Sequence, residues 1–293
     1  MLIKEIFKSF NEIIPTENAA EWDNSGEQIQ FSNEVVNSVL TTLEVTDEVI
    51  NEAISKDCNL ILSHHPLLFS KVNVISDDDP KARMLIKLIS NKISVFSAHT
   101  NYDVANGGTS DYLAKQLGLK DVSTIEGSEG FAMTGYLQER MSLEEFIKMA
   151  CESTGTPLNE VRFTGVRGNL VHKIGLCAGS GSDFILNAFN ADCDVFLTGD
   201  VKYHSAQDSL ELGMAVVDMG HYHTEKFFAV EAAKIYGDRI NSRTNTSIEF
   251  IPSKVDVNPF LCYNVRLGKP GSRVIFDFRS MRKVRAPQGE DAR

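Results

Sequence analysis

Apolar residues recur at helical spacing over the first fourteen residues of the chain. This spacing predicts an amphipathic first helix whose apolar face consists of Ile3, Ile6, Phe7, Phe10, Ile13 and Ile14. Glu5 and Glu12 interrupt the apolar stretch and no small-residue cleavage site follows it, so a signal peptide is not expected here. No stretch approaches the ~18 consecutive apolar residues of a membrane-spanning helix. We therefore expect a cytoplasmic protein that has no membrane partner.

Short apolar runs alternate with helical patterns from residue 39 onward. The apolar runs at residues 39–43, 59–62 and 93–97 predict strands. Helical patterns lie at residues 46–56, 80–90 and 110–117, with Thr46 as an N-cap, Pro80 in a first turn and Gly118 as a stop. Strands that are separated by helices of this length predict a βαβ series and a largely parallel sheet.

The alternation is interrupted between residues 131 and 170, where a second lobe is expected to begin. This stretch predicts a strand at 131–139, a capped helix at 142–154 and a turn at 155–157. The alternation then resumes, with strands expected at 172–179, 195–199 and 215–220 and helices at 182–190, 205–212 and 225–236. The predicted fold class is α/β with mixed, largely parallel sheets.

Composition and charge exclude several classes of protein. Five scattered cysteines without a C-x-x-C pair argue against a disulfide framework and a cysteine-rich zinc site, and they predict buried thiols. A net charge of −11 disfavours nucleic acid as a partner. From Arg266 onward, however, eight Lys or Arg stand against three Asp or Glu. This basic tail could contact an acidic partner or RNA, but GKPGS resembles a linker and we favour a non-native extension.

Six of the seven histidines lie in four segments that follow predicted strands. The segments are SHH at 63–65, AHTNYD at 98–103, TGDVKYH at 198–204 and GHYHTE at 220–225. Asp103, Asp200 and Glu225 lie among these histidines. Because ligands bind at the carboxyl ends of parallel strands, we expect the four segments to form one site. Imidazole and carboxylate groups without thiolates suit Zn, Mn, Fe or Co.

The spacing within these segments favours two metal ions rather than one. His64 and His65 would point to opposite faces of a regular strand, so at a strand end each could reach a different ion. Two ions about 3.5–4 Å apart need a bridging carboxylate, and Glu225 lies four residues after His221 on the predicted helix face. Taken singly, each pair has a plain structural explanation: a hydrogen-bonded turn, a capping pair of His99 with Asp103, or a solvated helix face. The four segments together predict a dinuclear centre.

Other motifs carry weaker signals. AGSGS at 178–182 could form an anion-binding nest before a helix, or simply a tight turn. Lys202 and His204 could act as acid, base or outer-sphere groups, or could be plain surface residues.

Five motifs, in order along the chain, resemble the Nif-three-like (YbgI/YqfO) dinuclear-metal family. They are WDNSG (22–26), SHHPLLF (63–69), AHTNYDVANGG (98–108), TGDVKYH (198–204) and GHYHTE (220–225). Members of this family often carry the name GTP cyclohydrolase 1 type 2 homologue. The chain departs from the family pattern at Glu27 and Gln30, and at Glu44, where relatives commonly have Asp.

The resemblance implies a fold, a site and an assembly. It implies two α/β lobes with the metals in the cleft: residues 1–125 plus about 214–262, and about 126–213, followed by the basic tail at 263–293. It implies a toroidal homohexamer. The implied metal ligands are His64, His65, Asp103, His221 and Glu225, with Glu225 bridging the two ions.

The function expected from these features is that of a metal-dependent hydrolase. Two divalent ions (Zn, Fe, Mn or Co) would activate water and polarise the target bond of a small molecule, with a guanine nucleotide implied by the family name. Glu225, His204 and Lys202 are the candidate catalytic residues, and His223 could assist as acid, base or anion contact. The alternatives are a non-catalytic metal carrier, insertase or regulatory scaffold that uses the same ligands, and a protein that binds a partner through the hexamer surface.

Overall fold

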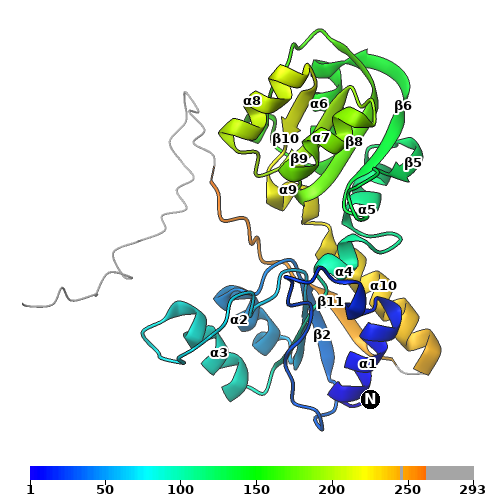
Figure 1. Ribbon diagram of the computed structural model, residues 1–293. Coiled ribbons are helices and arrows are strands. Elements are labelled where there is room, and N and C mark those ends of the chain that lie inside the picture. Colours follow the sequence, from blue (N-terminus) through cyan, green and yellow to red (C-terminus); the bar gives the residue numbers. More distant parts are fainter. Residues whose placement is uncertain (245–246, 262–293) are drawn as a thin grey trace, which may run out of the picture. The chain divides into compact units, whose positions relative to one another are not determined.

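The computed structural model describes residues 1–244 and 247–261, in which two β-sheets are covered by helices (Figure 1). The first sheet has the order β1 (Gly26–Ile29), β4 (Ser94–Ser97), β3 (Leu60–Ser63), β2 (Ser38–Thr42) and β11 (Glu249–Pro252). The second has the order β5 (Lys120–Thr124), β6 (Met133–Ser142), β8 (Leu170–Ser180), β9 (Val195–Gly199), β10 (Ala215–Asp218) and β7 (Arg162–Phe163).

Both sheets are mixed. In the first, β2, β3, β4 and β11 are parallel and only β1 is antiparallel to its neighbour. In the second, β8, β9 and β10 are parallel, whereas β5, β6 and β7 pair antiparallel. The expected largely parallel arrangement is therefore correct for the first sheet and wrong for the second. The antiparallel edge strands gave no apolar run, because β5 is mostly exposed and β7 has only two residues.

The helices of the first half are α1 (Ile3–Ile13), α2 (Asp47–Ser55), α3 (Pro80–Ser90), α4 (Thr100–Asp103) and α5 (Thr109–Gln116). Those of the second half are α6 (Leu143–Thr154), α7 (Ile185–Asn190), α8 (Tyr203–Leu212), α9 (His221–Glu225) and α10 (Phe228–Thr244). Three 3₁₀ turns complete the described elements: η1 (Thr16–Asn18), η2 (Leu158–Glu160) and η3 (Ser182–Phe184). The predicted helix at 225–236 is wrong at its start, because Glu225 ends the one-turn helix α9 and α10 begins only at Phe228.

Local sequence signals account for the boundaries of several helices. The Thr46 hydroxyl accepts from the amide of Val49 and caps α2, as predicted. Ser142 and Glu145 form a capping box at the start of α6, which Gly155 ends in the left-handed conformation (φ 64°). The predicted apolar face of α1 is confirmed, since its members are at most 9% exposed and pack with α10 on the first sheet. This burial supplies the main stabilisation of that layer.

The sheets divide the chain near residues 119 and 219, whereas the predicted lobe boundaries lie at 125–126 and 213–214. The division into lobes stays a prediction. The basic tail at 263–293 lies outside the described residues, as does Cys262. The other four cysteines are free and buried, as expected. Among the described residues, no helix is long and apolar enough to cross a membrane.

Candidate metal centre

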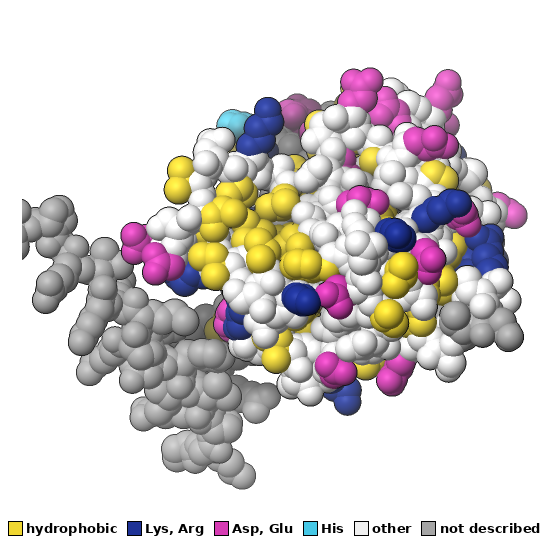
Figure 2. All heavy atoms as spheres, turned by 90° about the horizontal axis from the view of Figure 1, so that it is seen from below, with side chains coloured by type: hydrophobic (Ala, Val, Ile, Leu, Met, Phe, Trp, Pro, Cys, Tyr) yellow, Lys and Arg dark blue, Asp and Glu magenta, His cyan; other side chains and the backbone are white. Residues whose placement is uncertain are grey.

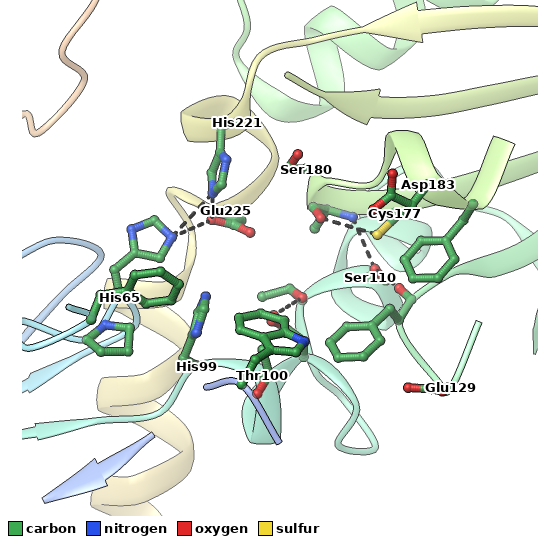
Figure 3. A pocket seen from close by; sticks show the side chains of 18 of the residues that line it. His65, His99, Thr100, Ser110, Glu129, Cys177, Ser180, Asp183, His221 and Glu225 are labelled. Carbon is green, nitrogen blue, oxygen red and sulfur yellow. Dashed lines mark hydrogen bonds and ion pairs between the residues drawn. The ribbon is translucent and has the colours of Figure 1, made fainter. Parts of the chain in front are cut away.

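A cavity of about 650 Å³ lies where the carboxyl ends of strands from both sheets meet (Figure 3). From the first sheet it receives His65, which follows β3, and His99 and Asp103, which follow β4. From the side of the second sheet it receives His221 and Glu225, which begin and end α9 after β10. Its walls carry four aromatic side chains, from Trp22, Phe69, Phe131 and Phe184. The cavity therefore joins polar strand ends to an apolar wall, as small-molecule sites commonly do.

His64 is fully buried beneath the cavity. Its Nδ1 donates to the carbonyl oxygen of Ala98 (2.8 Å), so in the neutral ring Nε2 is the nitrogen that carries the lone pair. This Nε2 is buried and has no hydrogen-bond partner. It lies 3.5 Å from Oδ1 of Asp103 and 3.8 Å from Oε1 of Glu225. A buried lone pair aimed at two carboxylates is expensive unless a cation lies between them.

His65 and His221 converge on Glu225 from opposite sheets. Their Nε2 atoms lie 3.2 and 2.9 Å from Oε2 of Glu225, and 3.3 Å from each other. Ligand atoms about 2.1 Å from a tetrahedral ion lie roughly 3.4 Å apart, so the three atoms have the spacing of ligands to one ion. Two protonated rings would repel each other at this distance, whereas two Nε2 lone pairs can share a cation.

The other nitrogen of each of these rings is held by an acidic side chain. Nδ1 of His65 donates to Glu44 (2.9 Å), and Nδ1 of His221 donates to Asp200 (2.8 Å). Metal-binding histidines almost always have such an acceptor, which fixes the tautomer and raises the basicity of the ligand nitrogen. Asp200 adopts a left-handed conformation (φ 55°) directly after β9, and the turn at this strand end brings its carboxylate to His221.

The charges of the cluster shift the pKa of its members. Burial disfavours the charged form of His65, but the hydrogen bonds and charges of Glu225 and Glu44 outweigh it and raise the pKa of His65 to about 9. Glu225 and Asp200 likewise outweigh burial and raise the pKa of His221 to about 11.

The two carboxylates of the cluster respond in opposite directions. Burial tends to raise the pKa of Glu225, but the three histidines, His221 foremost, hold it well below its usual range. Burial raises the pKa of Asp103, since nearby His64 and the hydrogen bond from Thr109 (2.5 Å) do not offset it. Without a metal, the raised pKa values of two of the histidines and of Asp103 mean that bound protons offset the negative charge of the cluster. A divalent cation replaces such protons when it binds.

These side chains form three groups that could hold a metal ion, within each of which the ligand atoms lie less than 4.8 Å apart. The groups are His64 with Asp103 and Glu225, His65 with His221 and Glu225, and His64 with His65 and His99. Glu225 is common to the first two groups. The five residues predicted as metal ligands are thus brought together, and their donors suit a divalent transition metal.

Gly179, in the AGSGS segment, permits Glu225 to occupy its place. A Cβ on Gly179 would lie 2.2 Å from Oε1 of Glu225, and its φ of 66° already favours glycine. The amides of Gly179 and Gly181 donate to the hydroxyls of Thr224 and Thr198. The segment therefore approaches the site closely with its backbone, and these two amides are not free to form the anion nest considered above.

The predicted catalytic residues differ in placement. Glu225 lies at the centre of the cluster, whereas Lys202 and His204 are exposed at the start of α8 and are not among the described residues that line the cavity. Lys202 instead lines a separate hollow of about 230 Å³. His223 is buried and contacts Glu160 through Nε2 (2.6 Å), away from the cavity. The catalytic assignment of Lys202 and His204 stays a prediction without geometric support within one chain.

Sequence reasoning missed the acidic partners Glu44 and Asp23 and did not select His99 as a site residue. His99 lines the cavity, and its Nδ1 donates to Asp23 (2.8 Å). Asp23 belongs to the motif at 22–26, so its position there was the available signal. Glu44 lies two residues after the end of β2, and this position near a strand end was the available signal.

The fold and the polar cluster identify a class of protein. The chain belongs to the Duf34/NIF3 (NGG1p interacting factor 3) family, whose sequence profile matches residues 1–259.

Individual relatives are similar over most of their length. A Clostridium perfringens protein called GTP cyclohydrolase 1 type 2 homolog is 32% identical over 265 residues, which cover 89% of this chain and 99% of the relative. A Schizosaccharomyces pombe protein called NIF3 homolog is 32% identical over 71% of this chain and 79% of its own. The crystal structure of a Staphylococcus aureus hypothetical protein is 28% identical and superposes with a TM-score of 0.83, over 90% of this chain and 99% of that one.

Proposed function

We propose that the chain is a dinuclear divalent-metal protein that hydrolyses a small molecule. Its metal ligands are His64, His65, Asp103, His221 and Glu225, with Glu225 shared between the two ions. The observation that carries the proposal is the position of Glu225. One of its carboxylate oxygens faces the unpartnered Nε2 of His64, and the other faces the paired Nε2 atoms of His65 and His221. Zn, Fe, Mn and Co all suit this donor set.

Residues around the cluster supply orientation. Glu44 and Asp200 fix the rings of His65 and His221, and the carbonyl of Ala98 fixes His64. Held by these residues, a pair of divalent ions would supply a Lewis acid that lowers the pKa of bound water and polarises the bond to be cleaved. Five protein ligands leave coordination positions open for water and substrate, and this favours catalysis over storage.

The cavity favours a compact substrate with a planar ring. Its volume of about 650 Å³ lies within the range of small-molecule sites. The four aromatic side chains of its walls suit ring stacking, while Lys81 lines the cavity together with the carboxylates of Glu129 and Asp183. A nucleotide or similar heterocycle contains such a planar ring. This agrees with the name that relatives carry, GTP cyclohydrolase 1 type 2 homolog.

The protein is further proposed to act as a cytoplasmic homohexamer. Figure 2 shows hydrophobic side chains gathered on the face seen from below in Figure 1. The exposed apolar residues of the chain include Ile54 of α2 and Ile86 and Ile89 of α3, which are 40–47% exposed. Exposed apolar surface is typical of subunit interfaces.

Turnover of the metal-loaded protein tests the enzymatic part of the proposal. Protein prepared without oxygen and reconstituted with Mn, Fe, Co or Zn is incubated with GTP and nucleotide analogues, and ring-opened products are measured by mass spectrometry. Turnover that His65→Ala abolishes is the expected result. Stoichiometric metal without turnover across a broad screen of heterocycles would instead support the alternative, a metal carrier or regulatory scaffold.

A further inference from the structure

His99 is oriented in the same manner as the histidines already assigned to the metal pair. Each of those rings has one nitrogen bound to an oxygen acceptor and the other directed at the cluster. His99 repeats this arrangement, since its Nδ1 donates to Oδ1 of Asp23 at 2.8 Å. Nε2 is therefore the nitrogen that carries a lone pair. Figure 3 shows the ring reaching from the chain after β4 toward His65 and Glu225.

Asp23 is held firmly enough to fix this ring. Its side chain is fully buried and accepts hydrogen bonds from the hydroxyls of Ser25 and Thr100, both 2.5 Å, and from the amide of Thr100. The amide of His99 itself donates to the Ser25 hydroxyl (3.3 Å). These contacts tie the segment at 23–25 to the end of β4. With the amide of Asn24 (2.7 Å) and His99 itself, the carboxylate has five donors, and this network holds it in place beside the imidazole.

The position of His99 brings it to the other ligands. One ring nitrogen each from His64, His65 and His99 lie within 4.8 Å of one another. The ring centroid of His99 lies 5.2 Å from that of His64 and 5.5 Å from that of His65. Its outer side faces Trp22 and Phe69, at 6.2 and 6.4 Å between centroids. His99 thus stands between the metal cluster and the aromatic part of the cavity wall.

We propose that His99 is a sixth protein ligand of the metal pair, oriented by Asp23. The inference rests on the proposed dinuclear site and extends it, because it assigns a function to the only cavity-lining histidine of the described residues that is not among the five predicted ligands. It also assigns a function to Asp23, which has the same relation to His99 as Glu44 has to His65.

Cobalt binding tests the proposal without any need for a substrate. Wild-type protein, His99→Gln, Asp23→Asn and the control His172→Gln are titrated with Co²⁺ under nitrogen, with the visible absorption spectrum and competition by a chelator as readouts. Glutamine can still donate to Asp23, so this variant preserves the local hydrogen bond. His172 lies beside Tyr136, away from the cavity, and controls for the loss of an imidazole elsewhere.

The expected result is a loss of affinity for one of the two ions. His99→Gln should lower the affinity for that ion at least tenfold and shift the cobalt absorption bands. Asp23→Asn should lower the affinity for the same ion about ten- to a hundredfold, which is the usual effect of removing a residue that orients a metal ligand. The His172→Gln control should bind as the wild type does.

A second measurement uses only the wild-type protein, so it does not depend on whether a variant folds. In cobalt-loaded wild-type protein with ¹⁵N-labelled histidine, each ligating ring that keeps its Nδ1 proton gives a strongly shifted N–H resonance. Four such resonances are expected if His99 is a ligand, and three would overturn the assignment.

Unchanged affinity and spectrum in His99→Gln would also overturn it, leaving His99 as a substrate contact. If the wild-type protein itself bound no more than one Co²⁺ per chain, the dinuclear site would be wrong, so the two failures are distinguishable.

Discussion

The two sides of the candidate site are built differently. The first sheet supplies His64, whose side chain is completely buried and whose ring is fixed by a backbone carbonyl. The second sheet supplies His221, whose side chain is 33% exposed and whose ring is fixed by the 48%-exposed side chain of Asp200. Glu225 lies between them and contacts both. We therefore expect folding alone to position the first side, and the second side to depend more on the proposed metal ions.

Removal of the shared carboxylate should have the largest effect. In Glu225→Gln, the amide cannot bridge two cations, and the Nε2 atoms of three histidines lose their common partner. We expect loss of both ions, measured by elemental analysis after gel filtration. Glu139→Gln, on the exposed part of β6, is the matched control and should retain them. Retention of both ions in Glu225→Gln would show that the two sides bind metal independently.

Gly179→Ala should nearly abolish metal binding although it replaces none of the proposed ligands. The added Cβ would lie 2.2 Å from Oε1 of Glu225, so the carboxylate must move. Gly118→Ala provides the control, since its φ of 68° is nearly equal and nothing lies within 4 Å of the new Cβ.

Both glycine variants should lose about 1–3 kcal/mol of stability through backbone strain, measured by chemical denaturation of the metal-free proteins. Only Gly179→Ala should lose metal. Equal metal contents in the two variants would mean that the close approach does not position Glu225.

Loss of the acidic residues that orient the histidines should have an intermediate effect on metal affinity. The size of this effect should differ between the two sides of the site. Glu44→Gln and Asp200→Asn each weaken the orientation of one ligand, and about ten- to a hundredfold loss of metal affinity is expected. Asp200→Asn should be the more damaging, because the side chain of His221 is 33% exposed, against 21% for His65. Chelator competition measures both. Equal effects would contradict the proposed difference between the sides.

Changes of pH should have the smallest effect, and their direction is fixed by His65. In the metal-free protein its pKa of about 9 lies above the ordinary value of 6.5, so its contribution to stability is complete below pH 6.5 and is lost as the pH rises toward 9. Metal competes with this proton. Metal affinity should therefore rise between pH 6.5 and 9, with protons released on binding, as calorimetry in buffers of different ionisation enthalpy can measure. Affinity independent of pH would contradict the assignment of His65 as a ligand.

The fold could be predicted from sequence wherever a local signal dominates. The boundaries of α2, α3 and α6 follow from Thr46, Pro80 and the capping box at Ser142, all of which act within one turn. The strands β1, β5 and β7 were missed because they are short or exposed edge strands whose pairing depends on distant residues. Such pairing leaves no periodic pattern in the sequence.

The clustering of the five proposed ligands was predictable for a similar reason, but the residues that orient them were not. His64, His65, Asp103, His221 and Glu225 all lie in segments that follow strands, and such segments gather at the carboxyl ends of the two sheets. Glu44 and Asp23 contact His65 and His99 from 21 and 76 residues away, and no spacing rule connects them. In the sequence Gly179 resembles an ordinary turn glycine, and only the structure shows that it lies against Glu225.

X-ray absorption of the anaerobically reconstituted protein tests the central claim most directly. With iron, manganese or zinc bound, the proposed site should hold two ions per chain and give a metal–metal scattering contribution at about 3.5–4 Å. Its ligand shell should contain imidazole and carboxylate but no sulfur. A single ion per chain, or two ions without a metal–metal contribution at that distance, would contradict the account of a shared Glu225 between two sides.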